Sequence, residues 1–327
     1  MMRKLFWAVL LILGIGAAYF FLPGFLKGKL EKGLEKALPG SQVSIGRLSI
    51  GTDLVLDVYD PVLVLKALPK ESNKSASIPL RGLRIHGLAL KANVGTVSAE
   101  AKGELSYDFK ASRFTLANLT IPSFKAGELL LKNIVLKIGE DGSGKLTVDS
   151  ITQQKLKLSN LSARAELDRE TLKLSGLEVS FAGGKITGIA GLHFTNPVSY
   201  TADLSIGRMD LSVLAKDLEI EAKVGLAGHV DGRIGLEGAA GGIQILKGGL
   251  SNTENGGDVV INDRTTLENL AQRVKQPLEV VESAFKEYHF DTASAGLSLK
   301  GHDLGLEVHL DGAKGKRDLD VTLHDFL

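Results

Sequence analysis

The stretches TLKLSGLEVSF (171–181) and KITGIAGLHF (185–194) decide the fold class of this chain. In both, apolar side chains recur at alternate positions, which places them on one face of a β-strand. A tight Ala-Gly-Gly turn separates the two runs. Alternating runs joined in this way are typical of a β-hairpin. The pair therefore predicts two adjacent antiparallel strands.

The same alternation extends from Gln42 through most of the chain. Further examples are QVSIGRLSIG (42–51), DLVLDVYD (53–60), FTLANLTIPSF (114–124) and KLKLSNLSARAEL (155–167). Parallel strands need crossover segments, usually helical, and no helical period separates these runs. We therefore expect a mainly β protein built on a long, curved, antiparallel sheet, with the shape of a groove.

Two short regions have a helical period instead. FLKGKLEKGLEKALPG (25–40) carries leucine at every fourth position, which predicts an amphipathic helix within 23–40. This helix either lies on a membrane surface or closes the end of the following β-structure. Residues 263–290 predict a helix pair divided by Pro277, with Thr265 and Glu268 at the spacing of a capping box. We expect this pair to cap one end of the sheet.

The first residues predict a membrane anchor. After Arg3 and Lys4, the stretch LFWAVLLILGIGAAYFFL (5–22) has eighteen uncharged, mostly apolar residues, enough for one membrane-spanning helix. A cleaved signal peptide is the alternative, because residues 16–18 are small. The expected organisation is a transmembrane anchor (1–22), a juxtamembrane helix (23–40) and a β-groove domain outside the cytoplasm (41–327).

Composition excludes several classes of function. Lys and Arg number 39 and Asp and Glu number 38, so no electrostatic attraction favours nucleic acid as a partner. The chain has no cysteine, which excludes thiolate metal sites and a cysteine nucleophile. The stretch IGEDGSGKL (138–146) resembles a phosphate-binding loop, but Leu146 stands where the loop needs Ser or Thr. We interpret it as a hairpin turn and expect no nucleotide.

Catalytic motifs are also missing from the sequence. The seven histidines are scattered without an HExxH motif, and no G-x-S-x-G elbow occurs. The acids are distributed among turns and outward strand positions, so no acid/base pair stands out. We therefore expect no enzyme activity, metal or cofactor.

A sheet with one apolar face must cover that face with protein or with a ligand. An acyl chain suits such a face, because each buried CH₂ contributes about 0.8 kcal/mol. Sixteen to twenty strands spaced ~4.8 Å apart would make a groove roughly 75 to 95 Å long. The inward positions expected to contact acyl chains are Val43, Ile45, Leu54, Leu56, Val58, Leu83, Ile85, Leu172, Leu174, Val179, Ile243 and Ile245.

Several motifs resemble a known family. ADLSIGRMDLSVLAKDL (202–218), GLAGHVDGRIGLEGAAGGIQILKGGLSNTENGGDVVI (225–261) and the region around VESAFKEYHF (281–290) resemble the C-terminal part of YdbH-type proteins of the AsmA-like superfamily, over about 200–327. LPGSQVSIGRLSI (38–50) is similar to the start of AsmA-like proteins. The resemblance implies an inner-membrane-anchored, single-pass, periplasmic β-groove protein linked to phospholipid traffic toward the outer membrane.

Three functions follow as hypotheses. The first is a groove that binds or conducts phospholipid acyl chains between the inner and outer membranes. The second is a non-enzymatic structural or assembly factor, whose sheet is filled by its own side chains and whose partners are envelope proteins. The third is an exported enzyme.

Overall fold

The computed structural model describes residues 27–28, 31–32, 41–50, 55–65, 81–108, 113–168, 171–193, 198–239, 242–300 and 303–323. The fold is mainly β, with 72% of residues in strands, as the alternation predicts. The predicted anchor (5–22) and most of the predicted juxtamembrane helix (23–40) lie outside the described residues. Within the described ranges, no helix combines the length and the hydropathy that crossing a membrane requires.

The chain divides into two compact units. The N-terminal unit comprises Met1–Lys145 and Leu167–Arg169, and the C-terminal unit comprises Leu146–Glu166 and Glu170–Leu327. Strands of the N-terminal unit are β1 (Gln42–Ser44), β2 (Arg47–Ile50), β3 (Val55–Tyr59), β4 (Val62–Leu65), β5 (Gly82–Val94), β6 (Val97–Asp108), β7 (Arg113–Ala126) and β8 (Leu129–Ile138).

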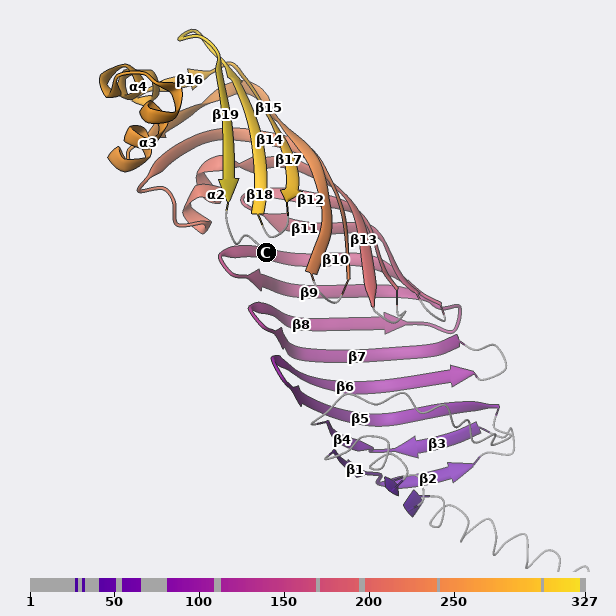
Figure 1. Ribbon diagram of the computed structural model, residues 1–327. Helices are drawn as coiled ribbons and strands as arrows, with labels where there is room; N and C mark the ends of the chain where they lie inside the picture. Colours follow the sequence, from indigo (N-terminus) through magenta and orange to yellow (C-terminus); the bar gives the residue numbers. More distant parts are fainter. Residues whose placement is uncertain are drawn as a thin grey trace, which may run out of the picture. The chain divides into compact units, whose positions relative to one another are not determined.

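Strands β5 to β8 form an antiparallel meander in which each strand pairs with the next (Figure 1). The expectation that all strand pairs are antiparallel is wrong at one place, because β3 and β4 both run parallel to β5. β4 ends at Leu65 and β5 begins at Gly82, and parallel neighbours require a connection of about a dozen residues or more.

β-Bulges interrupt the neighbouring strands β3–β4 and β5 at positions that lie opposite each other. Asp60 has a φ of 50° between β3 and β4, and the neighbouring position in β5 is Gly87, with a φ of 64°. A Cβ atom on Gly87 would lie 2.3 Å from Oδ1 of Asp60, so a larger residue would force the Asp60 side chain to move as well as adopt a positive φ. Bulges bend a strand and increase its twist. They therefore give these strands a physical cause of curvature.

The turn after β8 agrees with the interpretation of residues 138–146. Gly142 has a φ of 81° and its N–H donates to the Gly139 carbonyl over 3.0 Å. The Asp141 carboxylate accepts from the Ser143 N–H over 3.0 Å. Strand β9 (Ser143–Gln153) then begins directly, without the helix that a phosphate-binding loop needs.

The C-terminal unit contains a β-meander and the helices α2, α3 and α4. Its remaining strands are β10 (Leu156–Leu167), β11 (Thr171–Phe181), β12 (Gly184–His193), β13 (Ser199–Asp210), β14 (Val224–Ala239), β15 (Gly242–Ile261), β16 (Tyr288–Phe290), β17 (Thr292–Lys300), β18 (Asp303–Asp311) and β19 (Arg317–Leu323). The pair β11–β12 is the hairpin predicted from residues 171–194. Each consecutive pair from β11 to β15 is antiparallel, as are β15–β17, β17–β18 and β18–β19.

Helix α2 (Leu211–Asp217) was not predicted from the sequence. It follows β13 directly, and its N-cap is Asp210, whose carboxylate accepts from the Ser212 N–H over 2.8 Å. Leu211 of this helix packs against two hydrophobic clusters, one centred on β11–β14 and the other on β16 and β18. The strands of the C-terminal unit therefore curl around α2.

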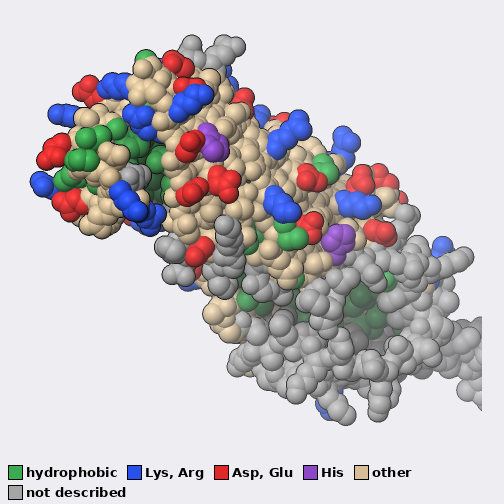
Figure 2. All heavy atoms as spheres, turned by 45° about the horizontal axis from the view of Figure 1, so that its top comes forward, with side chains coloured by type: hydrophobic (Ala, Val, Ile, Leu, Met, Phe, Trp, Pro, Cys, Tyr) green, Lys and Arg blue, Asp and Glu red, His purple; other side chains and the backbone are tan. Residues whose placement is uncertain are grey.

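Helices α3 (Arg264–Val274) and α4 (Leu278–Phe285) are the predicted pair, and Pro277 separates them as the N-cap of α4. The expected capping box is wrong in detail, since the carboxylate of Asp263 caps α3 by accepting from the Thr266 N–H over 2.9 Å. Both helices pack against Ile261 of β15 and Leu319 of β19. Figure 2 shows hydrophobic side chains gathered over these helices and surrounded by charged groups.

Candidate functional site

One face of β5–β8 is almost entirely apolar. Its residues lie opposite one another across the strand pairs, and we call this set the N-terminal apolar face. It comprises Leu83, Ile85, Leu88 and Leu90 of β5, Val97, Ala99, Ala101, Leu105 and Tyr107 of β6, Ala117, Leu119, Ile121 and Phe124 of β7, and Leu129, Leu131, Ile134, Leu136 and Ile138 of β8.

Most side chains of this face are only half-buried. Leu88, Ala101, Ala117 and Ile138 are buried, whereas the larger central residues, such as Leu105, Leu119 and Leu136, keep part of their surface accessible. In a sandwich, a second layer buries the inward residues of a sheet in a common core. The N-terminal apolar face is therefore less covered than a sandwich core.

The opposite face of the same strands is charged and exposed. Lys91 of β5, Lys102 and Glu104 of β6, and Lys125 and Lys137 on β7 and β8 are all exposed. Surface ion pairs occur among them, such as Lys91 with Glu100 at 3.6 Å. Water is therefore the natural environment of this face, and the apolar face is where a hydrophobic ligand would bind.

Five of the predicted contact residues belong to one cluster in the N-terminal unit. Ile45, Leu56 and Val58 are three of its four buried members, and Leu83 and Ile85 pack against the cluster. Leu83 and Ile85 also belong to the N-terminal apolar face, so this cluster is continuous with that face. A sixth predicted residue, Val43, is buried opposite Leu63. Leu54 lies outside the described residues.

The other predicted residues lie in the C-terminal unit. Val179 is buried in the cluster of β11–β14, and Leu174 packs against the same cluster. Leu172 is half-buried and lies opposite Leu192. In β15, a bulge separates the last two residues: Ile243 is half-buried opposite Gly238, whereas Ile245 is 44% exposed opposite Glu237.

The apolar face of the C-terminal unit changes along its strands. Near α2 it is buried, as at Leu177, Ile206 and Met209. Toward the other end of the same strands, Leu172 and Leu204 are half-buried. The reason is α2, whose residues Leu211, Val213 and Leu214 pack onto the buried part. The helix that sequence reasoning missed therefore fills part of the surface that a ligand could otherwise occupy.

Asp210 caps the N-terminus of α2. Hydrogen bonds from the Ser212 hydroxyl and from the backbone N–H groups of Ser212 and Val213 hold the pKa of this carboxyl below its usual range. Nearby, Tyr288 is fully buried, and its hydroxyl donates to the Gly315 carbonyl over 2.6 Å. Burial raises the pKa of this tyrosine. Both groups stabilise the fold.

Polar and aromatic side chains of β2, β3 and β5 contact one another across the strands. Oδ1 of Asp57 lies 3.3 Å from His86 Nε2. The rings of Tyr59 and His86 stack with 4.8 Å between their centroids, and the Arg47 guanidinium lies 4.2 Å from the centroid of the Tyr59 ring. These contacts make a ladder across strands on the charged face. No group of His, Asp and Glu residues suited to hold a metal ion occurs among the described residues.

Sequence reasoning named no residue of β6, β7 or β8, although these strands supply most of the N-terminal apolar face. Their alternation was visible in FTLANLTIPSF (114–124), but Pro122 and Asn133 interrupt the period in β7 and β8. Asn133 has a φ of 52°, and at this residue the apolar positions of β8 change parity without a shift of register against β7. An asparagine inside an alternating run was the available signal.

The comparisons with known proteins add no relative. No family model matches the chain, and neither a curated protein nor a solved structure does.

Proposed function

We propose that this protein binds phospholipid acyl chains on the apolar faces of its curved sheets. The observation that carries the proposal is the N-terminal apolar face, where four adjacent strands present large aliphatic residues that remain half-buried. Leaving such a face in water is unfavourable by about 25 cal/mol per Å² of apolar surface. A hydrocarbon chain laid along it would remove that penalty.

The cellular setting belongs to the same proposal. A groove-like, AsmA-like fold, an anchor at residues 5–22 in the inner membrane and a periplasmic location would place the apolar faces between two membranes. The protein would then hold or conduct phospholipids between them without catalysing a reaction. The resemblance of residues 38–50 and 200–327 to AsmA-like proteins supports this setting, as does the apolar stretch at the start of the chain.

The packing around α2 favours the second candidate function for part of the molecule. There the apolar interior is filled by Leu211, Val213 and Leu214, as expected of a structural or assembly factor whose partners are envelope proteins. The two functions differ in what contacts the half-buried residues of β7. An acyl chain would do so in the first case, and protein in the second.

Photo-crosslinking from β7 separates these functions. A photoreactive residue at Leu119, on the N-terminal apolar face, is compared with one at Thr120, the exposed neighbour on the charged face. After crosslinking in cells, mass spectrometry identifies what is attached. We expect phospholipid at position 119 and little at position 120. Lipid at both positions in equal amounts, or protein alone at position 119, would contradict the proposal.

A further inference from the structure

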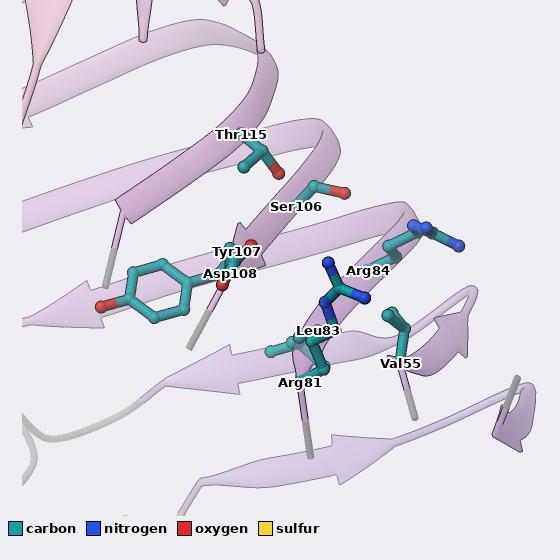
Figure 3. A pocket seen from close by; sticks show the side chains of 9 residues that line it. Val55, Arg81, Leu83, Arg84, Ser106, Tyr107, Asp108 and Thr115 are labelled. Carbon is teal, nitrogen blue, oxygen red and sulfur yellow. The ribbon is translucent and has the colours of Figure 1, made fainter. Parts of the chain in front are cut away.

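A small cavity of about 280 Å³ lies in the N-terminal unit, where several strands begin or end (Figure 3). It is lined by Val55, Arg81, Gly82, Leu83, Arg84, Ser106, Tyr107, Asp108 and Thr115. Val55 and Gly82 are the first residues of β3 and β5, and Asp108 is the last residue of β6. The cavity is therefore at the rim of the sheet.

The lining comes from both faces of the sheet. Leu83 and Tyr107 lie opposite each other and belong to the N-terminal apolar face, whereas Arg84 and Ser106 lie opposite each other on the charged face. The strand ends bring residues of both faces to the cavity, and the register of β6 and β7 also shifts here, between Ser106 and Tyr107. A molecule bound at this rim can therefore contact polar groups here while the rest of it extends over the apolar face.

Gly82 leaves the space open. A Cβ atom at this position would lie 2.9 Å from the Tyr107 carbonyl oxygen and 3.6 Å from Cγ2 of Val55. A side chain at this position would therefore crowd the neighbouring strand and project into the cavity. The volume is slightly below the usual range for sites that enclose a whole small molecule. It suits a compact polar group better than an acyl chain.

The charges of the cavity favour an anion. Arg81 is exposed at its edge, and Arg84 is oriented by Asp57, with 3.9 Å between Nη1 and Oδ1. Figure 3 shows both arginine side chains at the cavity, with the hydroxyl groups of Ser106 and Thr115 on the neighbouring strands. Two guanidinium groups with hydroxyl donors are the groups that recognise phosphate.

Asp108 is the carboxylate in the lining, so the three charged lining residues carry a formal net charge of +1, from two arginines and one aspartate. A phosphate would therefore bind toward Arg81 and Arg84 and away from Asp108. We infer that this rim cavity binds a phosphate group, with Arg81 as the principal contact. The inference rests on the proposed function in naming the phosphate as that of a phospholipid headgroup, whose acyl chains would lie against Leu83 and the face beyond it.

The test uses two probes with the same acyl chains. Dihexanoyl phosphatidic acid carries a phosphate, and dihexanoylglycerol does not. Isothermal titration calorimetry of the full chain measures the affinity for each, and for inorganic phosphate. Charge-assisted hydrogen bonds lead us to expect that the unmodified protein prefers the phosphate-bearing probe about tenfold or more.

Arg81→Gln should abolish this preference and leave the affinity for dihexanoylglycerol unchanged. The matched control is Lys125→Gln, which removes an exposed charge from β7 outside the cavity and should keep the preference. Equal midpoints of thermal unfolding establish that both variants are folded. A preference that survives Arg81→Gln, or is lost equally in Lys125→Gln, overturns the inference.

The remaining outcomes separate this inference from the proposed function. If dihexanoylglycerol binds and the phosphate adds no affinity, the rim cavity is not a headgroup site, although the apolar face still binds acyl chains. If neither acyl probe binds but inorganic phosphate does, and Arg81→Gln weakens it, the phosphate site stands and the proposed function fails. Inorganic phosphate that binds as tightly as the lipid would rule out the headgroup as its specific ligand.

Discussion

Two leucines in matched positions test whether the N-terminal apolar face is uncovered. Leu119 of β7 lies opposite Gly103, and Leu177 of β11 lies opposite Gly188. Both are inward residues inside long strands. They differ in cover, because Leu177 is 7% exposed within the cluster that α2 packs against, whereas Leu119 is half-buried.

The free energies of unfolding should therefore respond differently to truncation. Leu177→Ala removes buried carbons and leaves a cavity, which costs about 3 to 4 kcal/mol. Leu119→Ala removes three carbons, worth ~2.4 kcal/mol if fully buried, from a side chain that is partly in water already. Its cost should be about 1 kcal/mol, without a closed cavity. The expected difference is ~2 kcal/mol, or roughly 30-fold in local opening.

Hydrogen exchange measured by mass spectrometry suits this test, because it reports the opening of β7–β8 and β11–β12 separately within one protein. Protection in β11–β12 should fall much more in Leu177→Ala than protection in β7–β8 falls in Leu119→Ala. Equal losses in the two variants would mean that protein covers Leu119 as fully as Leu177. The reasoning behind the proposed lipid-binding face would then be refuted.

Three further variants and one matched control test the fold. Gly103→Ala should destabilise the protein by about 3 kcal/mol or more in urea unfolding, because φ is 150° and the new Cβ would lie 1.9 Å from a carbonyl oxygen of β7. The control is Gly95→Ala, in an open turn, which should cost about 1 kcal/mol. Asp210→Ala should cost about 1 kcal/mol through loss of the α2 cap. The folded-state pKa of Asp210 is lowered, so its stabilisation is present above the usual aspartate pKa and is lost as the pH falls through the folded value. Over that pH range, the thermal midpoint of Asp210→Ala should therefore fall less than that of the unmodified protein. Tyr288→Phe should lower the thermal midpoint by leaving the Gly315 carbonyl without its donor, at a cost of about 1 to 2 kcal/mol.

The period of the apolar residues was enough to predict most strands. TLKLSGLEVSF (171–181) corresponds to β11 residue for residue, and KITGIAGLHF (185–194) falls on β12 with its first and last residues displaced by one. The helix pair and its break at Pro277 were also predictable, since proline cannot donate a backbone hydrogen bond inside a helix. Local signals of this kind need no knowledge of the distant chain.

Pairing between strands was harder to predict. β3 and β4 are parallel to β5, although the runs that form them look like any other alternating segments of the chain. Direction depends on the path of the connecting segment, which period alone does not contain. Bulges add a second difficulty that period does not show: Val179 is buried in its cluster, whereas a shift of register pairs Ile243 and Ile245 with adjacent residues of β14.

The curvature of the strands could be predicted in part from residues that adopt a positive φ inside alternating runs. Asn133, Asn160 and Arg208 each have a φ near 50° within or at a strand, and Gly176 has a φ of 56°. Glycine and asparagine tolerate this conformation best, so their presence inside an alternating run indicates a bulge. Arg208 gives no such signal. Its amide donates to the Asp231 carboxylate over 2.7 Å, a contact between β13 and β14 that only the folded chain brings together.

Whether an apolar face is covered depends on parts of the chain outside the strand itself. Leu119 in ANLTI and Leu177 in SGLEV have similar neighbours, and period places both inward. What distinguishes them is α2, seven residues that follow β13 and pack onto the second site and not the first. Its only sequence signal is the N-cap Asp210 before LSVLAKD, within a segment that otherwise continues a strand.

A surface open to a ligand is therefore determined by which strands lack such a covering element. Among the described residues, β5–β8 combine a set of half-buried aliphatic residues with a charged opposite face. That combination is the reason to place the acyl chains there first.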